Sequence, residues 1–353
     1  MDKQLKMIYL LMILILNASC AEKRLTAKET DLSEPQKIPK TNTLKFTSGI
    51  RSIFQDSNGN YWFGSTQEGV ALYNGDSFTY FSTNEGLSNQ ILSIQEDKNG
   101  IIWFETQNGV NSYDGVAITD EIGRIPNNFN VGWMVSDDDL WFSAGSKEGV
   151  YRYDGSALHY LAFPISNDNP NNFYGVTSIS KGKNKMIWFG TYAGVLGYNE
   201  KEFKIINDKT PDLNIEVGSL HIRSILEDSK GRLWIGNNGI GVLLKEGNST
   251  INFSDKYKLI HPTSERNGDK SRPGTLEHVF LIAEDAQSNI WFADRDAGIW
   301  RYDGVKMTNY TKNDGFTNDN ALSIFNDDKG ELWFGMEDGK VYKFNGKTFE
   351  RQF

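Results

Sequence analysis

The sequence has little of several features that would assign a protein to a common class. It holds one cysteine, Cys20, so no disulfide can form within the chain. Basic residues are outnumbered, with 37 Lys and Arg against 46 Asp and Glu and a net charge of −9. Proteins that bind nucleic acid usually carry a basic surplus, so we expect no nucleic-acid partner. Phosphate-binding glycine loops, cysteine clusters and nucleophile motifs are also missing, and an enzymatic function is therefore not the leading interpretation.

Long apolar runs are missing too, apart from one near the N-terminus. Met7–Leu16 is an unbroken apolar run that follows Lys3 and Lys6. It is too short to span a bilayer as a helix and is typical of a signal-peptide core. The small residues that lead to Cys20 resemble a bacterial lipoprotein signal, in which the cysteine is lipidated and becomes the first mature residue. The sequence departs from that pattern at Asn17, where Leu is usual.

These features predict three segments. We expect a signal peptide over residues 1–19, a lipidated cysteine and flexible tether over 20–42, and one folded domain over 43–353. The expected location is extracytoplasmic, on the cell envelope, and the lipid is the only expected attachment to a membrane.

An internal repeat is the strongest signal in the chain. A Trp followed by Phe or Ile recurs at Trp62, Trp103, Trp141, Trp188, Trp234, Trp291 and Trp333. Most units place an Asp-x-x-Gly turn before the Trp, and Asn-Gly or Asp-Gly after the next strand. In such hairpins Asp caps backbone N–H groups and Gly supplies a positive φ. Seven units of this length predict an all-β fold, a seven-bladed β-propeller with four antiparallel strands in each blade.

The packing of the ring can be predicted in outline. We expect the Trp side chains to fill the space between neighbouring blades rather than to form a platform for ligands. The sixth unit has Ser288 where the turn glycine is usual, and the third unit is shorter. Two ways of closing the ring stay open. Lys347–Phe353 can serve as the outer strand of the last blade, or Thr43–Phe46 can add to the same sheet.

Three stretches carry a family resemblance. LSIQEDKNGIIWFETQNGVNSYDG, IRSILEDSKGRLWIGNNGIGV and LSIFNDDKGELWFGMEDGKVYKFNG resemble the two-component regulator propeller repeat, and the likeness covers about residues 43–353. In that family the propellers are the periplasmic sensor of membrane histidine kinases, often in carbohydrate-responsive systems. This sequence has one ring and no kinase or DNA-binding segment. The resemblance therefore implies a stand-alone, ligand-binding relative.

The candidate binding residues come from aligning the units. In a propeller, the loops that enter the inner strands surround the mouth of the central channel. Residues two and four places before the inner-strand Ile of each unit are expected there, and the connector before the fourth unit adds an aromatic residue. The candidates are Arg51, Gln90, Trp133, Tyr174, His221, Arg223, His278 and Asn320.

Two histidines, His221 and His278, hold equivalent positions in adjacent units. One interpretation is that they are strand-start residues bonded to backbone. The other is that they hold a divalent metal or an anionic group. The second resembles streptogramin-lyase-like propellers, which use His residues on neighbouring blades with a Glu and a divalent metal. Here Glu277 is adjacent to His278, and adjacent strand residues point to opposite faces. We therefore expect no catalytic residues, no metal and no cofactor, with a metal-dependent lyase as the alternative.

A long connector between the fifth and sixth units, Ser254–Thr275, is the remaining candidate. It carries a surplus of basic residues and can either recognise a carboxylate or sulfate or be a solvated insertion. Taken together, the sequence predicts a non-enzymatic propeller that binds a glycan or an envelope protein. A structural scaffold of the envelope is a further alternative.

Overall fold

The computed structural model describes residues 40–125, 133–165, 173–210, 213, 215, 220–264 and 270–353. Pro39–Phe353 forms one compact unit. The other unit, Met1–Ile38, lies outside the described residues, and so do Cys20 and the signal peptide predicted for residues 1–19.

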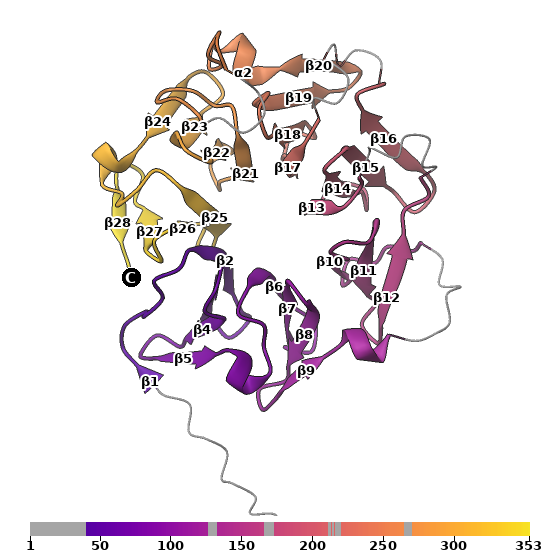
Figure 1. Ribbon diagram of the computed structural model, residues 1–353, viewed down its shortest axis with the longest axis vertical. Helices are drawn as coiled ribbons and strands as arrows, with labels where there is room; N and C mark the ends of the chain where they lie inside the picture. Colours follow the sequence, from indigo (N-terminus) through magenta and orange to yellow (C-terminus); the bar gives the residue numbers. More distant parts are fainter. Residues whose placement is uncertain are drawn as a thin grey trace, which may run out of the picture. The chain divides into compact units, whose positions relative to one another are not determined.

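Seven antiparallel sheets surround one centre, so the predicted seven-bladed β-propeller is confirmed (Figure 1). Within each blade the strands pair in the order in which they follow along the chain, and the first lies nearest the centre. The innermost strands of six blades are β2 (Ile50–Gln55), β6 (Ile91–Glu96), β13 (Val176–Lys181), β17 (Ile222–Glu227), β21 (Val279–Glu284) and β25 (Ala321–Asn326). The second strands, which carry the repeated Trp, are β3 (Tyr61–Ser65), β7 (Ile102–Thr106), β10 (Leu140–Ser143), β14 (Ile187–Thr191), β18 (Leu233–Asn237), β22 (Ile290–Asp294) and β26 (Leu332–Met336).

Two further strands complete each blade towards its outer edge. The third strands are β4 (Val70–Tyr73), β8 (Gly109–Tyr113), β11 (Gly149–Tyr153), β15 (Gly194–Tyr198), β19 (Val242–Glu246), β23 (Gly298–Tyr302) and β27 (Val341–Phe344). The outermost strands are β5 (Phe78–Phe81), β9 (Ile118–Asp120), β12 (Leu158–Ala162), β16 (Phe203–Asn207), β20 (Ser249–Asn252), β24 (Met307–Tyr310) and β28 (Phe349–Arg351).

Helix is scarce. The short helix α2 (Phe253–Lys256) follows β20, and single 3₁₀ turns cover Thr83–Glu85, Ile122–Arg124 and Lys312–Asp314. Among the described residues, none of these segments has the length and apolarity of a membrane span.

The third blade departs from the predicted pattern. Its described residues form three strands, and Trp133–Ser136 run up to them without joining the sheet. A buried carboxylate organises this segment instead. Asp139 accepts a hydrogen bond from the backbone N–H of Ser136 at 2.7 Å and is paired with Arg152, whose Nε lies 2.7 Å away. The local carboxylate thus satisfies a backbone donor that a strand would have placed in a ladder.

The Asp-x-x-Gly turns fold as predicted and have one contact that was not foreseen. Asp56 accepts hydrogen bonds from the backbone N–H groups of Asn58 and Asn60, at 3.0 and 2.9 Å. Its second oxygen accepts one from the Trp62 indole at 2.8 Å. The same indole bond recurs in Trp103–Asp97, Trp234–Asp228, Trp291–Asp285 and Trp333–Asp327. Where the sixth blade lacks the glycine, Ser288 adopts a φ of 61°. The turn therefore fixes both the hairpin and its Trp.

The Trp side chains lie between blades, as predicted. Trp62 packs on Phe104 of the second blade, with ring centroids 5.7 Å apart. Trp291 packs in the same way on Phe334 of the seventh blade, at 5.5 Å. Such pairs add about 0.5–1.5 kcal/mol beyond the burial of their area. The core of the ring is therefore a series of aromatic layers between sheets.

The ring closes by the first of the two predicted arrangements. β28 is the outer strand of the last blade, whereas β1 (Lys40–Thr41) pairs with β5 of the first. Phe353 then packs across onto Phe63 and Phe78 of the first blade, with centroids 5.5 and 5.0 Å apart. Side chains, not a shared strand, join the last blade to the first.

Candidate functional site

A β-bulge begins the innermost strand of each four-stranded blade. In the first blade Ile50 pairs with Ser65 and Ser52 pairs with Gly64, which leaves Arg51 as the extra residue. The same shift in register recurs in the other five. We call these extra residues the bulge ring, and they are Arg51, Leu92, Thr177, Arg223, Phe280 and Leu322. A bulge redirects the side chain of the extra residue away from the regular pleat.

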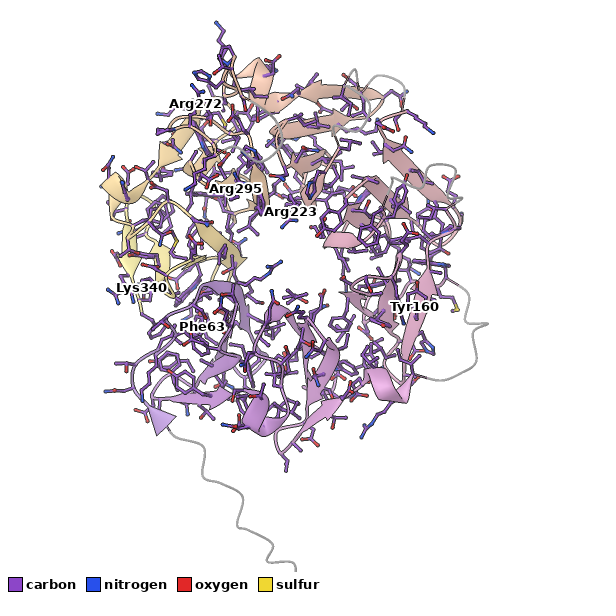
Figure 2. The ribbon with its side chains drawn as sticks, in the orientation of Figure 1. Phe63, Tyr160, Arg223, Arg272, Arg295 and Lys340 are labelled. Atoms are coloured by element: carbon purple, nitrogen blue, oxygen red, sulfur yellow. The ribbon has the colours of Figure 1, made fainter. Side chains whose placement is uncertain are left out.

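Two members of the bulge ring are arginines, and each influences its surroundings through its charge. Arg223 lies at the inner edge of the ring (Figure 2). Desolvation, followed by the positive charge of Arg223, lowers the pKa of Arg51, and the charges of Glu105 and Tyr192 act in the opposite direction. Because these residues belong to the fifth and first blades, which are not neighbours, their charges can interact only across the centre. Arg51 is reached by solvent. Within the described part of the chain neither arginine has a carboxylate ion-pair partner.

Aromatic rings surround Arg223. Its guanidinium carbon lies 4.3 Å from the ring centroid of Phe280 and 5.9 Å from that of Tyr192, distances that allow cation–π attraction. Tyr192 stacks on Phe173, at 5.6 Å between centroids, and touches His221 at 4.9 Å. Phe173 and Tyr192 are 41% and 40% exposed. We call these five residues the aromatic–arginine patch.

His221 is the polar member of this patch. Its Nδ1 lies 3.4 Å from the side-chain amide of Asn238. Its Nε2 is buried and has no hydrogen-bond partner among the described residues. Burial, followed by the charge of Arg223, lowers the pKa of His221 to about 4. The imidazole is therefore neutral near pH 7, and its Nε2 is a buried polar atom that is left unsatisfied within the described residues.

The residues four places before the inner-strand Ile, which the sequence alignment placed in equivalent positions, make equivalent backbone hydrogen bonds in six blades. The carbonyls of these residues accept a hydrogen bond from the residue that follows the second strand. The pairs are Gly49–Thr66, Gln90–Gln107, Gly175–Tyr192, His221–Asn238, His278–Arg295 and Asn320–Glu337. The donors lie four places after their Trp, so sequence analysis missed them although the same alignment could have found them. Tyr192 is the most consequential omission.

Trp133 and Tyr174 are placed differently from the prediction. Trp133 packs against Trp141 and Phe203, with centroids 6.1 and 4.7 Å apart. Tyr174 is 7% exposed, and its backbone N–H donates to Glu148 at 2.9 Å. Both belong to the core between the third and fourth blades. Their placement at the mouth assumed a regular third blade, which the described residues do not have.

His278 is bonded within the fold. It is fully buried, and its Nδ1 lies 2.8 Å from the hydroxyl of Ser271. The adjacent Glu277 accepts the backbone N–H of His261 at 2.6 Å. In the part of the chain that the structure describes, no three His, Cys, Asp or Glu side chains gather as a metal site would require. The residues present do not fit the divalent metal of the lyase alternative.

Gln90 and Asn320, the other two candidates, start their inner strands in partly buried positions. The backbone N–H of Asn320 donates to Asn318 Oδ1 at 2.8 Å. Among the described residues, neither forms a hydrogen bond or a ring contact with the aromatic–arginine patch. The structure thus unites three of the eight predicted residues, Arg51, His221 and Arg223.

Glu105, on β7, is a buried carboxyl that sequence analysis did not single out. The other blades carry small residues at its position, namely Gly64, Ser143, Gly190, Gly236, Ala293 and Gly335. A Cβ on Gly64 would lie 2.6 Å from Ile91 of the next blade, so a neighbouring inner strand leaves no room there. Glu105 borders the third blade, which lacks that strand among its described residues. Its carboxylate accepts from the Ser93 hydroxyl at 2.9 Å, and burial raises its pKa to about 7.

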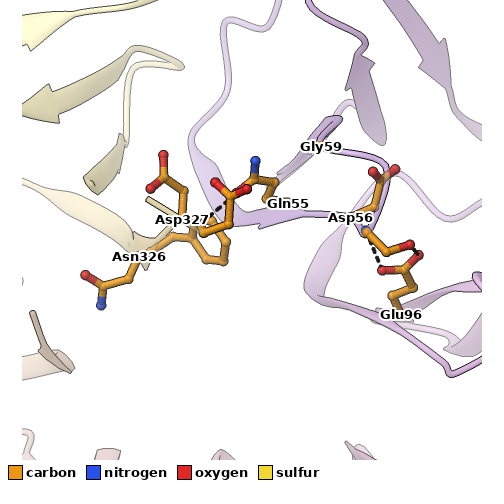
Figure 3. Close-up of a pocket in the computed structure, with 9 residues that line it drawn as sticks. Gln55, Asp56, Gly59, Glu96, Asn326 and Asp327 are labelled. Atoms are coloured by element: carbon orange, nitrogen blue, oxygen red, sulfur yellow. Dashed lines mark hydrogen bonds between the residues drawn. The ribbon is translucent and has the colours of Figure 1, made fainter. Parts of the chain in front are cut away.

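The opposite end of the inner strands has a different character. A pocket of about 450 Å³ lies between the hairpin turns of the seventh, first and second blades (Figure 3). Its carboxylates are engaged within the fold. Asp327 accepts from the Trp333 indole at 2.9 Å, and Glu96 accepts from the backbone N–H and hydroxyl of Ser57, at 2.7 and 2.6 Å. These groups serve the turns, so the pocket is not the candidate site.

The basic connector lies apart from the patch. Arg272 is found towards the outer edge of the ring, whereas Arg223 is at its inner edge (Figure 2). The Arg272 guanidinium is 3.2 Å from the His261 imidazole. Residues 265–269, including Arg266, lie outside the described residues.

Comparison with known proteins agrees with the fold. The family described as two component regulator propeller matches residues 45–67, 85–108 and 217–239, so the chain carries these repeats. No curated protein sequence matches. Among solved structures, the extracellular domain of a hybrid two component system from B. thetaiotaomicron aligns with a TM-score of 0.63 at 21% identity. The alignment covers 85% of this chain and 39% of that domain, so this chain spans less than half of its relative's length.

Two other solved propellers have a similar likeness. Virginiamycin B lyase from Staphylococcus aureus aligns with a TM-score of 0.60 at 16% identity, over 87% of this chain and 98% of the lyase. PorZ, a surface component of the type-IX secretion system of Porphyromonas gingivalis, aligns with a TM-score of 0.60 at 19% identity, over 86% of this chain and 47% of PorZ. At these identities the likeness shows the fold alone.

Proposed function

We propose that this chain, which carries two-component regulator propeller repeats, is a non-enzymatic, extracytoplasmic propeller that binds a glycan at the aromatic–arginine patch. The observation that carries the proposal is the exposed, stacked pair Phe173 and Tyr192 beside Arg223. Flat aromatic faces pack well on the C–H faces of sugar rings, and Arg and His supply directed hydrogen bonds. Its solved relatives include extracellular domains of two-component systems, which supports a sensor-like role.

The proposed location rests on the N-terminal sequence. Removal of residues 1–19 and lipidation of Cys20 would hold the propeller on the envelope through the tether of residues 20–42. Metabolic labelling with a radioactive fatty acid tests this. We expect label on the wild-type protein and none on Cys20→Ser. Equal labelling of both proteins would contradict lipidation.

Glycan binding is tested by titrating the purified protein with a panel of oligosaccharides. We expect saturable binding, at least about tenfold weaker in Tyr192→Ala, because a central aromatic anchor usually dominates an interface. Val305→Ala, 83% exposed and far from the patch in sequence, is the matched control and should bind normally.

Other outcomes would overturn the proposal. Capture of an envelope protein through Tyr192, with no oligosaccharide bound, would replace the glycan by a protein partner. Release of a cleaved product during the titration would show an enzyme.

A further inference from the structure

The centre of the ring holds two arginines, Arg51 and Arg223, that form no ion pair within the described residues. Arg51 enters from β2 and Arg223 from β17, each as the extra residue of a β-bulge. The guanidinium groups are close enough for the charge of Arg223 to act on Arg51. Like charges held in a confined space repel each other, so the fold maintains this arrangement at a cost unless an anion joins it.

The nearest carboxylate does not provide that anion. Glu105 is 8% exposed, and its hydrogen bonds come from the hydroxyl of Ser93 and the backbone N–H of Ser143. It forms no ion pair with either arginine in the described part of the chain. The charge of Glu105 acts to raise the pKa of Arg51, but no hydrogen bond or ion pair joins the two side chains among the described residues. The hydrogen-bond donors of the two guanidinium groups therefore remain available there.

One of the two arginines is also held in place. The planar guanidinium of Arg223 lies over Phe280 at 4.3 Å and near Tyr192 at 5.9 Å. Stacking on aromatic faces limits the rotamers of an arginine, so less entropy is lost when a ligand binds. The buried Nε2 of His221, which has no partner among the described residues, lies in the same patch.

The other members of the bulge ring offer little to a neutral polar ligand. Leu92, Phe280 and Leu322 are apolar. The hydroxyl of Thr177 already donates within the fold, and the carbonyl oxygen of Ile222 lies 2.7 Å from it. The strongest polar groups at the centre are thus the two cationic forks, whose geometry matches a carboxylate or a sulfate.

We infer that the ligand is an acidic saccharide, whose carboxylate or sulfate group binds between Arg51 and Arg223 while its sugar ring packs on Tyr192 and Phe173. This rests on the proposed function and adds the charge of the ligand to it. Carboxylate and sulfate share the chemistry that the arginines recognise, and the experiment separates them.

The test uses matched pairs of saccharides that differ only in charge. Oligogalacturonate is compared with its methyl ester, and a sulfated oligosaccharide with its desulfated form, by calorimetric titration of the full chain. We expect at least one acidic member to bind about tenfold or more tightly than its neutral partner. Arg51→Gln and Arg223→Gln should each remove that difference. Arg272→Gln, in the peripheral basic connector, is the matched control and should keep it.

Two further measurements keep the inference separable from folding defects and from the proposed function. Inorganic sulfate should raise the thermal midpoint of the wild type and not that of Arg51→Gln, whose midpoint without sulfate should be no lower than that of the wild type. Arg51→Lys, which keeps the charge, should recover part of the lost affinity.

If neutral and acidic saccharides bind equally well through Tyr192, the inference of an acidic ligand is wrong and the proposed function stands. If sulfate stabilises the wild type and no saccharide binds, the two arginines do bind an anion but the proposed function fails. If Arg272→Gln alone abolishes acidic binding, the connector is the site.

Discussion

The two ends of the inner strands follow opposite rules. At the hairpin end, the same Asp, turn and Trp recur, and five blades make the same bond from indole to carboxylate. At the bulge end, one backbone position is occupied by Arg in two blades, Leu in two, Thr in one and Phe in one. Residues that repeat in every blade serve what every blade needs, which is folding. Residues that vary over a constant backbone are free to serve recognition.

Hydrogen bonding shows the same contrast. Asp56 at the hairpin end has both carboxylate oxygens occupied by donors from its own hairpin. At the bulge end, His221 Nε2 is buried without a partner in the described residues, and Arg51 has no ion pair there. Leaving polar groups unsatisfied costs free energy. Their presence at the bulge end therefore favours a role for that end in recognition rather than in folding.

The largest expected effect comes from removing a Trp at the hairpin end. Trp291 is fully buried, packs on Phe334 and donates to Asp285 at 2.7 Å. Trp291→Ala should lower the free energy of unfolding by about 3–5 kcal/mol, as truncations of buried aromatic residues do. Chemical denaturation measures the change. Val305→Ala in the same blade serves as control, and a loss below 1 kcal/mol for Trp291→Ala would refute the folding role.

A turn carboxylate should have the next largest effect. Asp228 accepts from the Trp234 indole at 2.8 Å and from the backbone N–H groups of Lys230 and Arg232, each at 2.9 Å. Asp228→Ala should destabilise the protein by about 1.5–3 kcal/mol, because charged hydrogen bonds and a buried indole partner are lost. Denaturant unfolding at pH 7 measures this. An unchanged midpoint would mean that the turn does not depend on the carboxylate.

The same residue predicts a pH dependence. Although burial acts to raise it, hydrogen bonds from Trp234 and Arg232 hold the pKa of Asp228 below its usual range. The stability that this carboxylate contributes is therefore fully present above the pKa of an unfolded Asp, about 3.9, and is lost as the pH falls through the folded pKa. The gap between wild type and Asp228→Ala should close on acidification below about pH 4. A gap that widens there would have the wrong sign.

Glu105 sharpens the comparison because it is a carboxylate near the bulge end that is not engaged by a turn. Burial raises its pKa to about 7, above the unfolded value of about 4.3. The folded state keeps the proton longer than the unfolded state, so stability should fall between about pH 4.3 and pH 7 and then level off. Glu105→Gln should remove this loss, which is at most about 1.4 kcal/mol for each pH unit between those values, and should be more stable than wild type at pH 8 but not at pH 4. Thermal unfolding of both proteins at pH 4 and pH 8 tests this prediction. Equal pH profiles of the two proteins would contradict a raised pKa for Glu105.

The smallest effects on stability are expected in the aromatic–arginine patch. Phe173→Ala and Tyr192→Ala remove rings that are 41% and 40% exposed, and each should change the free energy of unfolding by no more than about 0.5 kcal/mol. The same variants should weaken ligand binding. Losses comparable to that of Trp291→Ala would remove the distinction between the two ends.

Much of the fold could be predicted from the sequence because its causes are local. The Asp-x-x-Gly turns before Trp62, Trp103, Trp234 and Trp333 specify hairpins by capping and backbone conformation, and the spacing of the seven Trp residues specifies the blade. The third blade could not be predicted in this way. The buried pair Asp139–Arg152 lies where the other blades lead into a ladder of strand hydrogen bonds, and no local sequence pattern indicates that pair. Trp133, assigned to the mouth by regular spacing, accordingly lies in the core.

For the site, the alignment selected Arg51, His221 and Arg223 but omitted Tyr192, which follows a second strand. The register of a strand pair identifies the bulge residue, but it does not identify the residue of another blade that lies beside it. The sequence by itself determined the unit, its turns and the number of blades, because those depend on residues within about 40 positions of each other. Only the tertiary structure decided that the charge of an arginine in the fifth blade acts on an arginine in the first, because ring closure brings together side chains that are 172 positions apart (51 to 223).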